Sequence, residues 1–134
     1  MGALLGFDFG PRKIGVAVGQ PITRSASALT TIRSRRNGPD WARIEQLVHE
    51  WQPMGAVVGL PFNMDDTEST LAPEARRFAR QLKERCGLEV HLVDERLTSL
   101  EARRQLGRDA TSLETIDAMA AKLILETWLT DTAS

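Results

Sequence analysis

The stretch GFDFGPRKIGVAVGQ, residues 6–20, decides how the fold begins. Apolar residues on its N-terminal side predict a buried strand over residues 3–9, and alternating β-branched residues predict a second strand over residues 14–20. A Gly-Pro pair separates the two strands, and both residue types favour a turn. The stretch therefore predicts a β-hairpin that carries one carboxylate, Asp8, inside its first apolar strand.

The rest of the chain predicts an alternation of helices and strands. Apolar residues recur either with helical spacing or in short runs that suit buried strands. Asp40 is suited to begin the first helix as its N-cap residue, and Gly87 is suited to end the second. The expected strands cover residues 27–33, 55–60 and 88–93, and the expected helices cover residues 41–51, 72–85, 99–106 and 112–129.

This order of elements predicts the fold class. Three consecutive strands are expected to pair antiparallel, whereas strands separated by helices are expected to pair parallel. We therefore expect an α/β protein with a mixed five-stranded sheet, three antiparallel strands followed by parallel strands, and with helices on both faces. The length of 134 residues suits one domain over residues 1–134.

Composition narrows the possible classes of protein. The chain has no apolar run long enough to span a membrane, and its N-terminus lacks the basic region of a signal peptide. We therefore expect a cytoplasmic protein with no membrane partner. Its one cysteine, Cys86, excludes an internal disulfide and a zinc site built from several cysteines. The formal net charge of -1 excludes a strongly basic nucleic-acid-binding domain, but it leaves room for local basic patches.

Three acidic residues are candidates for a metal site. Asp8 lies in an apolar strand, where a carboxylate is costly unless it is paired or binds a cation. Glu95 follows the last strand at the end where α/β sheets bind ligands. Asp117 falls in the second turn of the last helix, beside a predicted apolar stripe that would face the sheet. Clustered carboxylates favour Mg²⁺ or Mn²⁺. The predicted stripe consists of Ile116, Ala120, Leu123 and Ile124.

Each acid also has a structural interpretation without chemistry. Asp8 could accept backbone hydrogen bonds in a turn. Glu95 could pair with Arg12 or Arg96 at the sheet edge. Asp117 could merely interact with the positive end of the helix dipole.

Tryptophans and arginines have equally simple interpretations. Trp41, Trp51 and Trp128 lie on apolar helix stripes and are predicted to be core residues rather than platforms for stacked bases. The arginines of the loop at 33–36 and of the helix at 76–85 are predicted to form solvated surfaces, which is the usual role of charge runs.

Four blocks of sequence resemble the YqgF/RuvX family of the RuvC-like, RNase H-like superfamily. They are GFDFGPRKIGVAVGQ at 6–20, VVGLPFNMDDT at 57–67, VDERLTSLEAR at 93–103 and IDAMAAKLILE at 116–126. The resemblance covers almost the whole chain and keeps the order of the blocks. It implies an RNase H-like fold.

The resemblance also implies a reaction and a set of site residues. It implies a nuclease that hydrolyses phosphodiester bonds and matures the 5′ end of pre-16S rRNA. Asp8, Glu95 and Asp117 would be both the catalytic residues and the ligands of one or two Mg²⁺ or Mn²⁺ ions. The expected partners are pre-rRNA, structured DNA and ribosomal precursor particles, and the expected state is a monomer or weak dimer. The candidates for substrate contacts are Arg12, Lys13, Asn63 and Arg96.

Three other functions stay open at this point. Family members carry the older description of Holliday-junction resolvase, which would need two sites facing one junction. A non-catalytic module that binds RNA or a transcription factor could retain the same fold. The hairpin also resembles the phosphate-binding hairpin of the actin and sugar-kinase group, but those proteins bind ATP between two such domains.

Overall fold

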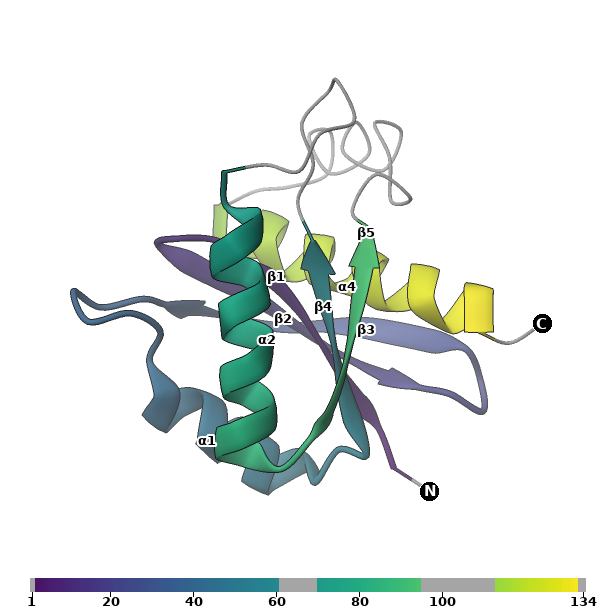
Figure 1. The fold of residues 1–134 in the computed structure, drawn as a ribbon. Helices are drawn as coiled ribbons and strands as arrows, with labels where there is room; N and C mark the ends of the chain where they lie inside the picture. Colours follow the sequence, from purple (N-terminus) through teal and green to yellow (C-terminus); the bar gives the residue numbers. More distant parts are fainter. Residues whose placement is uncertain (1, 61–69, 95–112, 133–134) are drawn as a thin grey trace.

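The computed structural model describes residues 2–60, 70–94 and 113–132, with only the backbone described at 113–117 and 131–132. Five strands and three helices make up this part of the chain (Figure 1). The strands are β1 (Leu4–Phe9), β2 (Lys13–Gln20), β3 (Ser25–Arg33), β4 (Gly55–Leu60) and β5 (Glu89–Asp94). The helices are α1 (Trp41–Trp51), α2 (Ala72–Cys86) and α4 (Leu113–Thr132).

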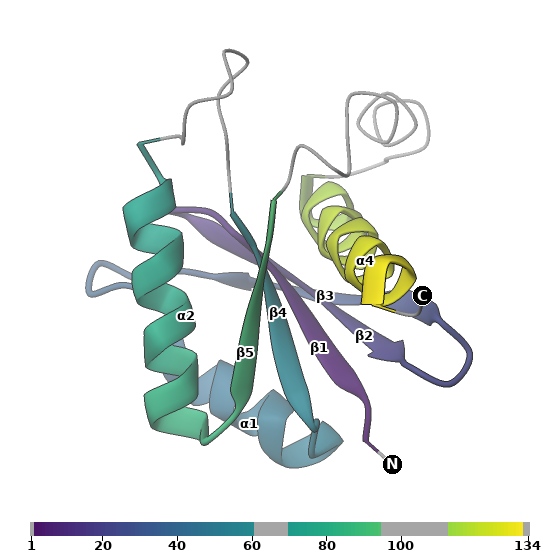
Figure 2. The ribbon, with the colours of Figure 1, turned by 45° about the vertical axis from the view of Figure 1, so that its right-hand side comes forward.

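The strands form one sheet in the order β3-β2-β1-β4-β5. β1 and β3 both pair antiparallel with β2, whereas β4 pairs parallel with β1 and with β5. The expected mixed five-stranded sheet is therefore confirmed. Because β1, β4 and β5 are parallel, their C-terminal ends lie at one edge of the sheet, and Figure 2 shows this edge beside the first turns of α4.

Helices cover both faces of the sheet, with α1 and α2 on one side and α4 on the other (Figure 2). Alternation along each strand supplies the two cores, because successive side chains point to opposite faces. Leu5 and Phe7 of β1 pack with Ile44 of α1 and Phe78 of α2. Leu4, one residue along, packs instead with the α4 core.

Glycines allow α4 to lie close to the sheet. A Cβ atom placed on Gly6 would lie 3.0 Å from Leu125 Cβ and 3.1 Å from the Ala121 carbonyl oxygen. A Cβ atom placed on Gly19 would lie 2.7 Å from Leu125 Cδ2. Strand and helix are therefore in contact where these glycines occur.

The buried side of α4 differs from the predicted stripe. Of the three stripe residues whose side chains the structure describes, Ile124 is buried, while Ala120 and Leu123 are half-buried. The helix is apolar on most of its circumference, so spacing alone does not identify one face. The buried residues of its described part are Ala118, Ala121, Ile124, Leu125 and Leu129.

The ends of α1 and α2 follow local rules. Asp40 Oδ1 accepts a hydrogen bond from the Arg43 amide at 3.2 Å, which confirms the predicted N-cap. Gly87 ends α2 with a φ of 66°, which glycine adopts without strain. The prediction of a core role is wrong for Trp51, which is 39% exposed because it lies in the last turn of α1, beyond the packed stripe. The helix predicted over 99–106 lies outside the described residues.

Candidate active site at the C-terminal edge of the sheet

Asp8 lies in β1 one residue before its C-terminal end. Phe7 and Phe9 pack on the side of α1 and α2, so alternation directs the Asp8 side chain toward the face that α4 covers. Asp8 is half-buried and takes part in a polar interaction, so it is not a free carboxylate. The structure thus places the first predicted acid on the α4 face, at the edge where α/β sheets bind ligands.

The neighbours of Asp8 in the sheet have no side chains. Gly15 of β2 pairs directly with Asp8 and shares its face. On the other side, Phe7 pairs with Val58, so Gly59 follows as the next residue of β4 on the α4 face. Neither neighbour can cover the Asp8 carboxylate with a side chain. Gly15 was not among the site residues predicted from the sequence, and only the strand register reveals its position beside Asp8.

The direction of α4 brings its first turns level with Asp8. Gly19, which pairs with Leu4, contacts Leu125 and Leu129, whereas Gly6 contacts Ala121 and Leu125. Moving two residues along β1 therefore moves the contact one turn toward the start of α4. Two strand residues span about 6.6 Å, and four helix residues span about 6 Å. Moving two further residues along β1, from Gly6 to Asp8, therefore brings the strand level with the helix turn at residues 117–121.

The backbone of α4 places residue 117 one helical turn before the buried Ala121 and two turns before the buried Ile124. This is the helix position of Asp117. Glu95 lies outside the described residues, and it follows Asp94, the last residue of β5. Asn63 and Arg96 also lie outside the described residues.

Arg12 and Lys13 lie at the turn between β1 and β2, near the end of the strand that carries Asp8. The Ser34 amide donates a hydrogen bond of 2.8 Å to the Arg12 carbonyl oxygen, which ties the turn to the end of β3. Arg12 is exposed and Lys13 is half-buried. The structure therefore brings two cations to the same edge as Asp8.

The described residues supply no complete metal site. No group of three or more His, Cys, Asp or Glu side chains suited to a metal ion occurs within residues 2–60, 70–94 and the described side chains of α4. Of the three predicted acids, the described side chains include only that of Asp8. No helix in the described part of the chain is long and apolar enough to cross a membrane.

Cys86 is not an activated nucleophile. Burial, and secondarily the negative charge of Glu45, raises the pKa of its thiol, and Arg85 opposes the shift. A raised pKa keeps the thiol protonated at neutral pH, whereas the thiolate is the reactive form. Cys86 is therefore a partly buried, protonated thiol at the end of α2.

Two solved structures share the fold of this chain. "T. thermophilus RuvC in complex with Holliday junction substrate" has a TM-score of 0.61 and 15% identity, covering 100% of this chain and 97% of that chain. "Thermus thermophilus RuvC structure" has a TM-score of 0.60 and 16% identity, covering 97% of this chain and 96% of the other. The expected RuvC-like, RNase H-like fold is confirmed.

Several relatives share about half of their residues with this chain. A protein of Azotobacter vinelandii named "Putative pre-16S rRNA nuclease" is 52% identical over 132 residues, covering 96% of this chain and 93% of that protein. A protein of the same name from Nitrosococcus oceani is 50% identical over 131 residues, covering 96% of this chain and 86% of that protein. Another protein of this name, from Yersinia pestis, is 47% identical over 134 residues, covering 97% of this chain and 96% of that protein.

The sequence model of the RuvX family, described as "Holliday junction resolvase", matches residues 2–131. The match spans all the described strands and nearly all of α4. Together with relatives that are half identical over nearly their full length, it shows that this chain belongs to the RuvX family.

Proposed function

We propose that this chain is a divalent-metal-dependent nuclease that hydrolyses phosphodiester bonds and processes the 5′ end of pre-16S rRNA. One observation carries the proposal. Asp8, a half-buried carboxylate, lies at the ligand-binding edge of a RuvC-like sheet, between two glycines and level with the first turns of α4. The substrate follows from the names of relatives that are half identical to this chain.

The donor chemistry at this edge fits a hard divalent cation. Asp8 supplies carboxylate oxygens, and Glu95 and Asp117 are the further acids that the chain brings to the end of β5 and the start of α4. Oxygen ligands of this kind suit Mg²⁺ or Mn²⁺, in one or two ions. When bound, such ions activate water and stabilise the charge that develops on the departing oxygen.

The remaining residues would hold the substrate. Arg12 and Lys13 lie at the same edge and carry the positive charge that a phosphate backbone requires. Asn63 and Arg96, in the segments that follow β4 and β5, are the other proposed substrate contacts. The expected partner is therefore pre-rRNA, free or in a ribosomal precursor particle.

Junction resolution is the second candidate. The family model is described as a Holliday junction resolvase, and one RuvC structure of the same fold is a complex with a junction. Cutting a four-way junction symmetrically would require a dimer that presents two Asp8 sites to one substrate. A non-catalytic module that binds RNA is the remaining alternative.

The test is a cleavage panel with the full chain. Labelled pre-16S rRNA fragments, duplex DNA and a four-way junction are incubated with Mg²⁺, Mn²⁺ or EDTA. We expect RNA cleavage that needs the metal and falls at least about a thousandfold in Asp8→Asn, equivalent to about 4 kcal/mol. Asp8→Asn should melt no lower than the wild type in EDTA. Cleavage of the junction alone would favour the resolvase, and cleavage of nothing would favour the binding module.

A further inference from the structure

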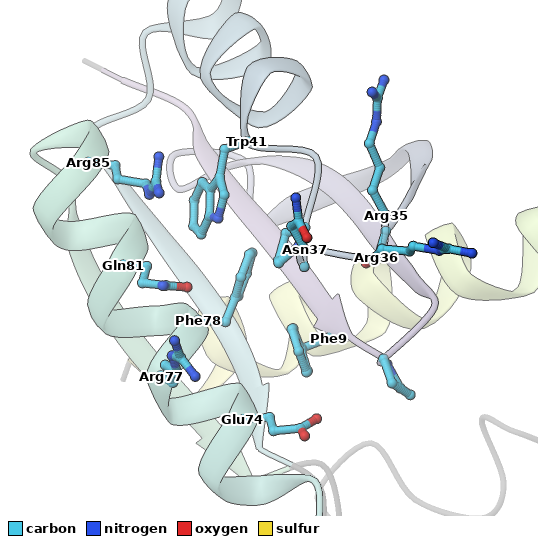
Figure 3. A pocket seen from close by; sticks show the side chains of 14 residues that line it. Phe9, Arg35, Arg36, Asn37, Trp41, Glu74, Arg77, Phe78, Gln81 and Arg85 are labelled. Atoms are coloured by element: carbon cyan, nitrogen blue, oxygen red, sulfur yellow. The ribbon is translucent and has the colours of Figure 1, made fainter.

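A second site lies on the opposite face of the sheet from Asp8. A cavity of about 530 Å³ opens between α2, the loop from Ser34 to Pro39 and the end of β1 (Figure 3). Its volume is in the range of small-ligand sites. We call it the arginine groove, because four arginines line it: Arg35, Arg36, Arg77 and Arg85.

Two basic segments that are far apart in the sequence meet in this groove. Arg77 and Arg85 lie along α2, and Arg35 and Arg36 belong to the loop on the other side of the groove, where Figure 3 shows their side chains extending away from α2. Among the described residues that line the groove, Glu74 is the one carboxylate. Positive charge is thus concentrated here in a chain whose formal net charge is -1.

Much of this charge is not neutralised within the protein. Within the described part of the chain, the Arg35 guanidinium has one ion-pair contact, a long one of 3.7 Å to the Asp40 carboxylate, and its side chain is 80% exposed. Among the residues that the structure describes, neither Arg36 nor Arg77 has an ion-pair partner. Exposed guanidinium groups of this kind bind phosphate oxygens well.

Aromatic rings form the floor of the groove. Trp41 stacks on Phe78 with ring centroids 5.4 Å apart at 27°, and Phe9 lies 5.2 Å from Phe78 on its other flank. Phe78 is 1% exposed, so it supports the two half-buried rings rather than binding a ligand itself. The Arg85 guanidinium carbon lies 4.8 Å from the Trp41 ring centre. Nucleic-acid bases stack on both aromatic rings and guanidinium planes.

The groove ends beside the candidate active site. Phe9 lines the groove and directly follows Asp8 in β1. The two side chains point to opposite faces of the sheet, but both lie at its C-terminal edge. A flexible polymer that leaves the groove over the end of β1 therefore arrives at Asp8.

We propose that the arginine groove binds a single-stranded segment of the substrate RNA next to the bond that is cut. This inference rests on the proposed function, which makes RNA the substrate. The four arginines contact phosphates, and Asn37 and Gln81, which also line the groove, hydrogen-bond to bases or ribose hydroxyls. A single strand fits better than a duplex, because only unpaired bases can reach an aromatic floor between a helix and a loop.

The test compares two double variants that remove the same charge. Arg36→Ala/Arg77→Ala alters the groove, whereas Arg43→Ala/Arg80→Ala removes arginines of α1 and α2 that do not line it. Binding of a fluorescein-labelled single-stranded RNA to the full chain is measured by anisotropy in EDTA, from 50 to 200 mM salt. We expect at least tenfold weaker binding for the groove variant and a salt slope smaller by about 1.4, since each lost single-strand phosphate contact removes about 0.7. The affinity of the control variant for the RNA should differ from that of the wild type by less than twofold.

Three results would overturn the proposal. One is an equal loss of RNA-binding affinity in both double variants, which would indicate only a general effect of charge. The second is equal affinity for a duplex of the same sequence. The third is displacement of the RNA by adenosine monophosphate at concentrations near the RNA's own dissociation constant, which would make the groove a mononucleotide pocket.

The groove and the nuclease can fail separately. If the wild type cleaves no substrate, but the groove variant binds RNA more weakly and the control variant does not, the assignment of the groove is supported and the proposed function is wrong. If Asp8→Asn abolishes cleavage while the groove variant binds RNA as tightly as the wild type, the nuclease function is supported and the assignment of the groove is wrong.

Discussion

Gly6 and Gly19 both face α4, but an added methyl group would meet different atoms at each. At Gly6 it would meet the Ala121 carbonyl oxygen at 3.1 Å and Leu125 Cβ at 3.0 Å, atoms that move only with the helix itself. At Gly19 the three nearest atoms are in the side chains of Leu125 and Leu129, which can change rotamer. Tolerance of a side chain should therefore differ between the two positions.

We predict that Gly6→Ala lowers the free energy of unfolding by about 1–3 kcal/mol, the usual cost of overpacking. Gly19→Ala should cost clearly less. Because α4 carries Asp117, Gly6→Ala should also reduce RNA cleavage at a temperature where both variants are folded. Urea unfolding midpoints and cleavage rates check this, and equal losses of stability would show that α4 shifts freely on the sheet.

Cys86 gives a second test at the scale of one residue. Since burial raises its pKa, less thiolate is present at pH 8 than in a free cysteine, and alkylation by iodoacetamide should be slower. The rate should rise as the pH increases toward that raised pKa, and it should reach the normal value in urea. A native rate equal to that in urea would show that the thiol is not shielded.

At the scale of elements, the sequence predicts what local chemistry controls. The helix over 41–51 and the strand over 55–60 match α1 and β4 at both ends, because a cap residue and short apolar runs define them. Asp8 could be placed in the same way, since strand alternation is a local property.

What the sequence could not predict depends on contacts between distant segments. Arg36 and Arg77 belong to two runs that each suit a solvated surface, and only the packing of α2 beside the loop brings them into one groove. Trp41 lies on an apolar stripe and packs on Phe78, as predicted for a core residue, yet it also lines that groove. The buried face of α4 was mispredicted because apolar residues surround most of that helix.

The start of α1 provides an element-scale prediction, since Asp40 both caps the helix and follows the loop that carries Arg36. Asp40→Ala removes the acceptor for the Arg43 amide and should cost about 1 kcal/mol of stability. Asp40→Asn keeps an acceptor and should cost much less, although it weakens the exposed contact with Arg35. Thermal melts of the two variants check this, and equal losses would assign the effect to the ion pair instead of the cap.

At the scale of the whole molecule, one edge of the sheet joins two surfaces of different chemistry. The face toward α4 presents Asp8 between glycines, where a cation is expected, and the other face presents the arginine groove, where phosphates are expected. A substrate that crosses the end of β1 would be held on one face and cut on the other. The arginines of the groove would thus bind phosphates on the face away from Asp8, whereas Arg12 and Lys13 would bind them at the edge that Asp8 shares.

A metal that binds the folded chain and not the unfolded chain must stabilise the whole molecule. At a free Mn²⁺ concentration of about one hundred times the dissociation constant, the gain is about 2.7 kcal/mol, or roughly 8–12 °C in melting temperature for a chain of this size. The shift should disappear in Asp8→Asn, which loses a ligand. It should persist in Glu89→Gln, because Glu89 begins β5 at the opposite edge of the sheet and its side chain is 76% exposed. Differential scanning calorimetry with and without Mn²⁺ measures all three proteins. An equal shift in wild type and Asp8→Asn would place the metal elsewhere and contradict the assignment of Asp8 as a ligand.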